Sequence, residues 1–166
     1  IHNCGYGYGA SSDITKEGIL KATEEAKKWA EYSAGRLIHQ LAPPEVNVDN
    51  GKYFTHEKDS WAKESNKDKV DYLMEINKSL KCKPTISNWG ASFRYNKLET
   101  LFTDTNGSKF RQNISYILPQ LIACAEHKKQ IQTRTFGGHA HARQTGYNFL
   151  KESNLINQAK QIANDA

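Results

Sequence analysis

The chain has few cysteines and no long apolar run, and both absences exclude classes of protein. Its three cysteines, Cys4, Cys82 and Cys124, are far apart and form no C-x-x-C pair. An odd number of distant cysteines favours neither a disulfide framework nor a zinc knuckle. No apolar run approaches the ~20 residues that a membrane span needs. We therefore expect reduced thiols in a soluble, cytoplasmic protein with no membrane partner.

The beginning of the chain also lacks two features. Ile1 to Gly5 contain neither an initiator methionine nor the charged and then apolar pattern of a secretion signal. The length of 166 residues suits one domain, or one domain and a piece of another. We interpret the chain as starting inside a longer protein.

An excess of positive charge is present, but it is spread along the sequence. The chain has 23 basic and 18 acidic residues, which gives a net charge of +5. The basic residues alternate with acidic ones, as in Lys21–Lys28 and Lys63–Lys69. A nucleic-acid footprint should gather on one face, whereas this distribution is typical of solvated helices. We do not expect nucleic acid as the main partner.

The first 44 residues read as the end of an α/β segment. Gly5–Gly9 alternates glycine with tyrosine. It lacks the spacing of a phosphate-binding loop, so we predict a glycine-rich strand. Apolar residues then recur at helical spacing over about residues 15–34, and Pro43-Pro44 ends any helix. We place a domain boundary between residues 1–44 and 45–166.

Residues 45–166 change from helical to alternating patterns. Residues 44–66 are polar and irregular, with a turn predicted at Asn50-Gly51. A helix is predicted from Asn66 or Asp68 to Leu80. Asn106-Gly107 is typical of a β-hairpin, and Pro119 predicts an edge strand or a bulge. Four stretches alternate apolar and polar residues as strands do: Thr85–Tyr95, Leu98–Thr105, Lys109–Cys124 and Gln130–Phe136.

A last helix is predicted from Lys151, where apolar residues return to helical spacing. The order of helix, helix, antiparallel strands and helix predicts the α+β class. We expect an antiparallel β-meander with flanking amphipathic helices.

Three stretches, in the right order, resemble the TldD/PmbA family, whose members are often described as modulators of DNA gyrase. Gly7–Gly18 is similar to the W-G-F-A-S-T-N-D-L-T-E-E segment of that family. Lys69–Leu73, Ile86–Tyr95 and Glu99–Gly107 resemble its helix and two following strands. Gln132–Leu150 resembles its R-x-S-G-x-G-G-R-G-G-Y-E-F-L region. The likeness covers nearly the whole chain.

The resemblance implies a part of a zinc metallopeptidase. In this family a His-Glu-x-x-x-His helix in the carboxyl-terminal half holds the metal and supplies the general base. The only His-Glu pair here is His56-Glu57, and Ser60 and Trp61 occupy the positions where a second histidine would stand. The chain therefore resembles the amino-terminal, non-catalytic part of such an enzyme. Its implied partners are the rest of its own chain, a sibling subunit and an unfolded peptide.

Candidate binding residues cluster near the last predicted strand. We expect a strip that contacts an extended peptide, and its members are Arg134, Gly137, Gly138, His139, Arg143 and Tyr147. His139 and His141 would share a face on an extended strand. Two ligands without a nearby Cys, Asp or Glu make a poor metal site, so a surface role is favoured.

Two functions from different classes remain open. The first is a scaffold that forms a peptide-binding cleft and a subunit interface of a peptidase, with strand addition at a sheet edge as the binding mode. The alternative is a stand-alone binding module with nucleic acid as its candidate ligand, since the chain is basic and contains three tryptophans.

Overall fold

The computed structural model describes residues 4–38 and 48–166. The chain divides into two compact units, Ile1–Asn47 and Val48–Ala166. The boundary predicted between residues 44 and 45 lies outside the described residues. None of the helices in the described ranges has the length and apolar character needed to cross a bilayer.

The first unit is built around α1 (Lys16–Ser33), which confirms the predicted helix. The side chain of Thr15 caps it by accepting a hydrogen bond from the backbone N–H of Gly18. The predicted strand at Gly5–Gly9 is not formed over Tyr6–Gly9, and Gly5 makes only an isolated bridge. A Cβ on any of the three glycines would clash with the α1 backbone, so their small size serves close packing against a helix.

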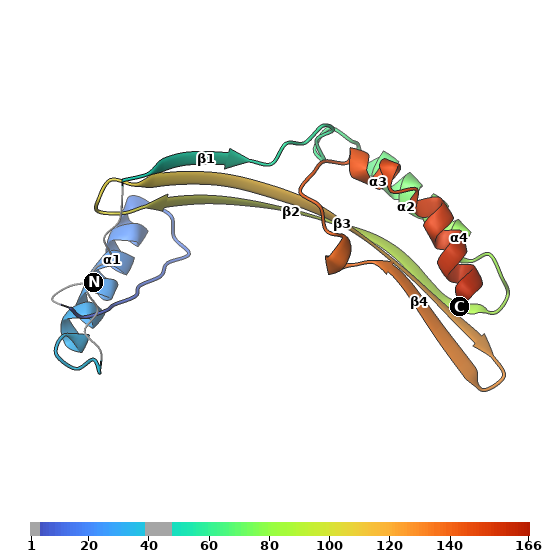
Figure 1. Ribbon diagram of the computed structural model, residues 1–166, viewed down its shortest axis with the longest axis horizontal. Coiled ribbons are helices and arrows are strands. Elements are labelled where there is room, and N and C mark those ends of the chain that lie inside the picture. Colours follow the sequence, from blue (N-terminus) through green and yellow to red (C-terminus); the bar gives the residue numbers. More distant parts are fainter. Residues whose placement is uncertain (1–3, 39–47) are drawn as a thin grey trace. The chain divides into compact units, whose positions relative to one another are not determined.

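The second unit contains a four-stranded sheet centred on β3 (Lys109–His127). β2 (Ile86–Thr103) pairs antiparallel with one edge of β3 over nearly its whole length. Two strands share the other edge (Figure 1): β1 (Asn50–Phe54) runs parallel to Lys109–Asn113, and β4 (Gln130–Gly137) runs antiparallel to Gln120–His127.

The α+β class is confirmed, and the meander is confirmed in part. β2, β3 and β4 follow one another as antiparallel neighbours, and the predicted turn at Asn106-Gly107 joins the first two, with Gly107 at φ 98°. The two strands predicted within residues 85–105 are one continuous strand. The turn predicted at Asn50-Gly51 is wrong, because both residues begin β1, whose parallel pairing makes the sheet mixed.

Pro119 lies in the central strand, paired opposite Phe93, so the predicted edge or bulge is wrong. Its neighbour Ile117 exchanges backbone hydrogen bonds with Arg143 on the edge that β1 and β4 share. Backbone groups alternate along an antiparallel strand, so the nitrogen of Pro119 faces the same edge. On that edge, the Pro119 nitrogen lies between the segment paired with Arg143 and the segment paired with β4. Because no strand of the described chain pairs there, the missing N–H of proline removes no hydrogen bond of the ladder.

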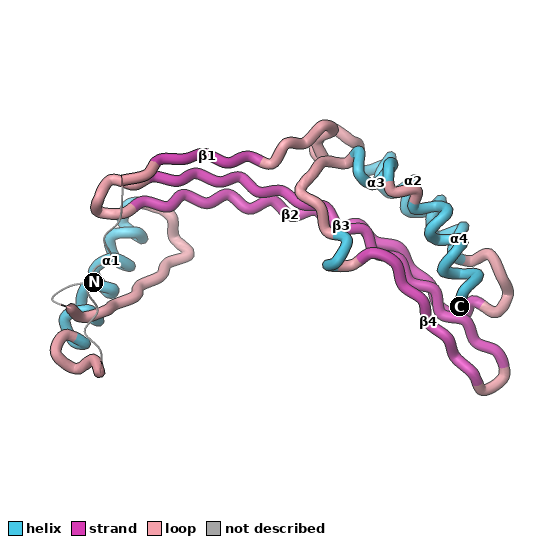
Figure 2. The backbone as a smooth tube through the Cα atoms, in the orientation of Figure 1, coloured by secondary structure: helices cyan, strands magenta, loops and turns pink. Residues whose placement is uncertain are grey.

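Three helices cover one face of part of this sheet (Figure 2): α2 (Asn66–Leu80), α3 (Asn148–Glu152) and α4 (Leu155–Asp165). The predicted helices from Asn66 and from Lys151 are thereby confirmed, the latter as two segments. A buried core lies between the helices and the strands, and it includes Ile76, Leu80, Ile86, Ile117, Leu121, Leu150, Leu155 and Ala159.

The apolar side of β3 changes along its length. From Ile117 to Ala125, the odd-numbered residues are buried under the helices. From Phe110 to Tyr116, the apolar residues are even-numbered and thus lie on the opposite face. We call residues 86–95, 117–127 and β4 the inner half of the sheet. Residues 96–103, 109–116 and β1 form the outer half, and none of them belongs to the hydrophobic core under the helices.

Candidate functional site

The predicted binding residues lie along a segment that leaves β4 and passes the edge of β3. It runs through the short 3-10 helix η1 (His139–His141) and an isolated bridge between Arg143 and Ile117. It ends where the N–H of Tyr147 donates to the carbonyl oxygen of Asp59, at 2.7 Å. The segment thus joins the sheet edge to the loop that follows β1.

Glycine is required at the point where this segment leaves β4. Gly137 has φ 93°, and a Cβ there would clash with the carbonyl oxygen of Pro119. Gly138 has φ 76° and ψ −164°, a region that only glycine occupies readily. Its N–H donates to the same Pro119 oxygen, at 2.9 Å. The glycines therefore end β4 and turn the chain, and their backbone lies at the surface of the predicted strip.

The two histidines are placed differently from the expectation. His139 and His141 belong to η1 rather than to an extended strand, so the argument that they share one strand face does not apply. Nδ1 of His141 lies 3.1 Å from the carbonyl oxygen of Gly137, and its ring packs on Phe136 with centroids 4.7 Å apart. His139 is exposed. His141 thus helps to hold the turn after β4.

The charged and aromatic members of the strip do not form one cluster. Arg134 bonds to the Gln132 side chain and to the Thr133 carbonyl oxygen, whereas Arg143 bonds to backbone oxygens of its own segment. Tyr147 is only 1% exposed and packs in the core. Burial raises the pKa of Tyr147, and the nearby carboxylates of Glu64 and Asp68 raise it further, so its ring stays neutral.

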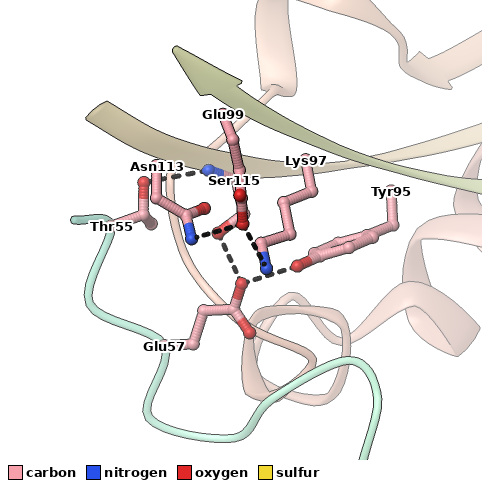
Figure 3. A network of polar contacts seen from close by, with 7 residues as sticks. All are labelled: Thr55, Glu57, Tyr95, Lys97, Glu99, Asn113 and Ser115. Atoms are coloured by element: carbon pink, nitrogen blue, oxygen red, sulfur yellow. Dashed lines mark hydrogen bonds and ion pairs between the residues drawn. The ribbon is translucent and has the colours of Figure 1, made fainter. Parts of the chain in front are cut away.

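A polar network that sequence reasoning missed lies next to this segment (Figure 3). The carboxylate of Glu57 accepts hydrogen bonds from Tyr95 Oη, at 2.7 Å, and from Ser115 Oγ. The N–H of Ser115 donates to Thr55 Oγ1, at 3.0 Å. Beside them, Glu99 pairs with Lys97 at 3.1 Å and accepts from Asn113 Nδ2. The network fixes the loop after β1 onto β2 and β3.

Glu57 is held as an anion. Burial raises the pKa of Glu57, but the hydrogen bonds from Ser115, Tyr95, Ser60 and the backbone of Trp61 outweigh it and leave the pKa below its usual value. A carboxylate with this many donors is a poor general acid or base near neutral pH. The network therefore suits a structural anchor better than a catalytic centre.

The network lies where the inner half of the sheet meets the outer half. Trp61 stacks on Tyr95 with centroids 5.3 Å apart and an interplanar angle of 2°. Nζ of Lys69 lies 4.4 Å from the centroid of the Trp61 ring, in cation–π geometry. The only signal for this cluster in the sequence is the His56-Glu57 pair, whose spacing to other residues suggests nothing of its partners.

On the outer half, the two faces of the sheet differ in charge. The face that continues from the helix-covered side is basic and carries Lys52, Lys97, Lys109 and Arg111, with Glu99 as its only acidic residue. The opposite face has no charged side chain, and its larger residues are Tyr53, Leu98, Phe102, Phe110, Ile114 and Tyr116. We call these the basic face and the uncharged face.

The zinc that the family resemblance implies does not fit the donors of this chain. Within residues 4–38 and 48–166, no group of three or more His, Cys, Asp or Glu side chains could hold a metal ion. Oε1 of Glu57, the one acidic residue of the His-Glu pair, already accepts hydrogen bonds from both Tyr95 and Ser115.

No protein-family model and no curated protein matches the chain.

Proposed function

We propose that the chain is the amino-terminal, non-catalytic portion of a TldD/PmbA-like zinc metallopeptidase, in which it forms a scaffold, part of a peptide-binding cleft and a subunit interface. The three quoted sequence stretches support this assignment. One of them, Gln132–Leu150, runs from within β4 through η1 into α3 and holds the two glycines that end β4. The hydrolytic step belongs to a carboxyl-terminal part that carries the metal.

The free edge of β4 is the observation that carries the peptide-binding role. β4 pairs with β3 through one edge, and no strand among the residues that the structure describes pairs with its other edge. The alternation of an antiparallel strand directs the N–H and C=O groups of Ile131, Thr133 and Thr135 away from β3. These three residues are exposed. An extended peptide can add as a further strand here and reach the Gly137-Gly138 turn.

A binding measurement with an unfolded peptide tests this role. We expect fluorescence anisotropy to detect binding of a labelled extended peptide without acidic clusters. Thr133→Pro removes an outward N–H of β4 and should weaken binding at least tenfold, because proline cannot donate to an added strand. Lys52→Pro, which alters the exposed β1 strand at the other end of the sheet, serves as the control. Equal binding by the Thr133→Pro variant would reject the β4 edge as the peptide site.

The family assignment has its own test in the native gene. We expect a His-Glu-x-x-x-His helix to be encoded downstream of Ala166. A native gene that continues without such a motif would remove the assignment to a metallopeptidase while leaving peptide binding at β4 open.

The alternative of a nucleic-acid-binding module is favoured by one observation, the basic face. Four basic side chains gather there around a single acid, which the scattered sequence positions did not predict. Binding of single-stranded nucleic acid that weakens steeply with salt would support the module. Lys109→Glu with Arg111→Glu should then abolish this binding, whereas the peptidase assignment predicts no retention of nucleic acid at physiological salt.

A further inference from the structure

The outer edge of β2 is long and has no strand partner. β2 is the last strand on its side of the sheet, and in the described part of the chain its backbone bonds only to β3 from Trp89 to Thr103. Even-numbered residues of β2 face β3, so the odd-numbered residues direct their N–H and C=O groups outward. Natural sheets protect such edges with proline, bulges or many charges, because an open edge pairs with other chains.

The outer part of this edge lacks those protections. Residues 93–103 contain no proline, and the one irregularity of the β2 ladder lies at Ile86 and Asn88. None of residues 96–103 belongs to the hydrophobic core that lies under the helices of this unit. The charged residues of this stretch are Arg94, Lys97 and Glu99. This composition fits a protein interface better than a solvent-exposed edge.

We propose that a second copy of this chain pairs with β2 through its outer edge, antiparallel, with Leu98 of each copy on the two-fold axis. This register places Lys97 opposite Glu99 of the partner subunit, and symmetry repeats the pair. Both side chains lie on the basic face, half exposed, where opposite charges across strands attract. On the other face of β2, Arg94 of the inner half lies opposite Phe102 of the partner subunit, a cation–π pairing.

The charges also select this register over its neighbours. A shift of two residues in one direction sets Lys97 opposite Lys97 of the partner subunit. A shift in the other direction sets Glu99 opposite the partner's Glu99. Like charges directly opposite destabilise a sheet, so both shifted pairings are disfavoured. The pairing of residues 93–103 forms on the order of ten backbone hydrogen bonds and joins the uncharged faces of two copies into one surface.

This inference gives a location to the subunit interface of the proposed function, but it needs only the edge of β2 and does not depend on the peptidase assignment. It places the subunit contact on the opposite side of the sheet from the proposed peptide site on β4. Loss of the dimer would therefore leave peptide binding intact, and loss of peptide binding would leave the dimer intact.

Cross-linking of single cysteines tests the register. In a chain with Cys4, Cys82 and Cys124 replaced by serine, Leu98→Cys should give a disulfide-linked dimer on mild oxidation. Residues on the axis face each other at a Cα separation of about 4.5 Å, within the range of a disulfide. Thr100→Cys is the matched control, because the two copies of residue 100 lie roughly 13 Å apart. Absence of the Leu98→Cys dimer, or equal linkage through Thr100→Cys, would overturn the proposal.

Charge exchange tests the pairing without cysteine. Lys97→Glu and Glu99→Lys should each weaken the dimer about tenfold in analytical ultracentrifugation. A mixture of the two variants should form heterodimers, because each then presents the opposite charges, and the Lys97→Glu/Glu99→Lys double variant should recover the original affinity. Lys52→Glu, the same charge change on β1, should leave the dimer unchanged. A monomeric unmodified chain at 100 μM, or single variants that dimerise as well as the parent, would contradict the proposal.

Discussion

The inner and outer halves of the sheet share the strands β2 and β3, yet they are built for different neighbours. In the inner half, Ile117, Leu121 and Ala125 point to one face and pack against the helices. In the outer half, that same face carries Lys109 and Arg111 and is exposed. The helix layer therefore stops where the odd-numbered residues of β3 change from apolar to polar, between Ile117 and Ser115.

The transition between the halves is held by polar side chains rather than by apolar packing. Ser115 is the last odd-numbered polar residue before Ile117, and it is buried at 3% exposure. Glu57 satisfies its hydroxyl group, so the loop after β1 closes the end of the core. The comparison teaches that stability resides in the inner half, while the outer half is available for contacts.

The largest difference between the two halves should appear when the same Leu→Ala substitution is made in each and the free energy of unfolding is compared. Leu121→Ala removes a fully buried side chain from the inner core and should lower the free energy of unfolding by about 2–5 kcal/mol. Leu101→Ala changes a side chain that is 62% exposed and should alter it by no more than about 0.5 kcal/mol. Urea unfolding checks both values, and equal losses would break the comparison.

The turn that ends the inner half should show the next effect. Gly137→Ala meets both a positive φ and the Pro119 oxygen, and should cost roughly 2–4 kcal/mol of unfolding free energy. Gly138→Ala also has a positive φ but has no atom within 4 Å of the added Cβ, and should cost less, roughly 1–2 kcal/mol. Thermal unfolding in which Gly138→Ala is the worse variant would contradict this placement.

Removal of the Glu57 carboxylate, which anchors the loop after β1 where the two halves meet, should change the free energy of unfolding by a smaller amount. Glu57→Ala leaves the hydroxyl groups of Ser115 and Tyr95 without their acceptor. It should lower the free energy of unfolding by about 1–3 kcal/mol. Glu99→Ala removes an exposed carboxylate from the same neighbourhood and should cost less than about 1 kcal/mol. Chemical denaturation of the two variants side by side measures the difference, which would vanish if the Glu57 bonds contributed nothing.

The smallest effect should be the change with pH in the stability that Glu57 contributes. The pKa of Glu57 is lower in the folded chain than its unfolded value near 4.5. The ionised carboxylate therefore contributes its full share of stability above the unfolded pKa, and this share is lost as pH falls through the folded pKa. The Tm difference between the parent and Glu57→Gln should therefore shrink as pH falls from 7 to 3. A difference that is constant over this range would show that the ionised carboxylate is not what stabilises the anchor.

Much of the fold follows from local patterns in the sequence. α1, α2 and the carboxyl-terminal helices appear where helical spacing predicts them, and Asn106-Gly107 forms the predicted hairpin turn. β1 was missed because a five-residue strand with mostly exposed side chains leaves no clear alternation. Pro119 was misplaced because its tolerance depends on a gap created by Arg143 and β4, which are distant in sequence.

The candidate site was less predictable than the fold. The glycines at 137 and 138 mark a turn in the sequence, and the structure gives both a positive φ. The burial of Tyr147 depends on α2 and α4, which its local sequence does not indicate. The partners of Glu57 lie 38 and 58 residues away, so no spacing rule connects them.

Hydrogen exchange of the β2 amides tests the central claim, that the inner half of the sheet is self-contained and the outer half is completed by a second copy. The outward amides of Lys97, Glu99 and Leu101 should exchange rapidly at micromolar concentration and become protected at high concentration. Core amides, such as that of Leu121 in β3, should be protected at both. Outward β2 amides with the same exchange rate at every concentration would contradict the account.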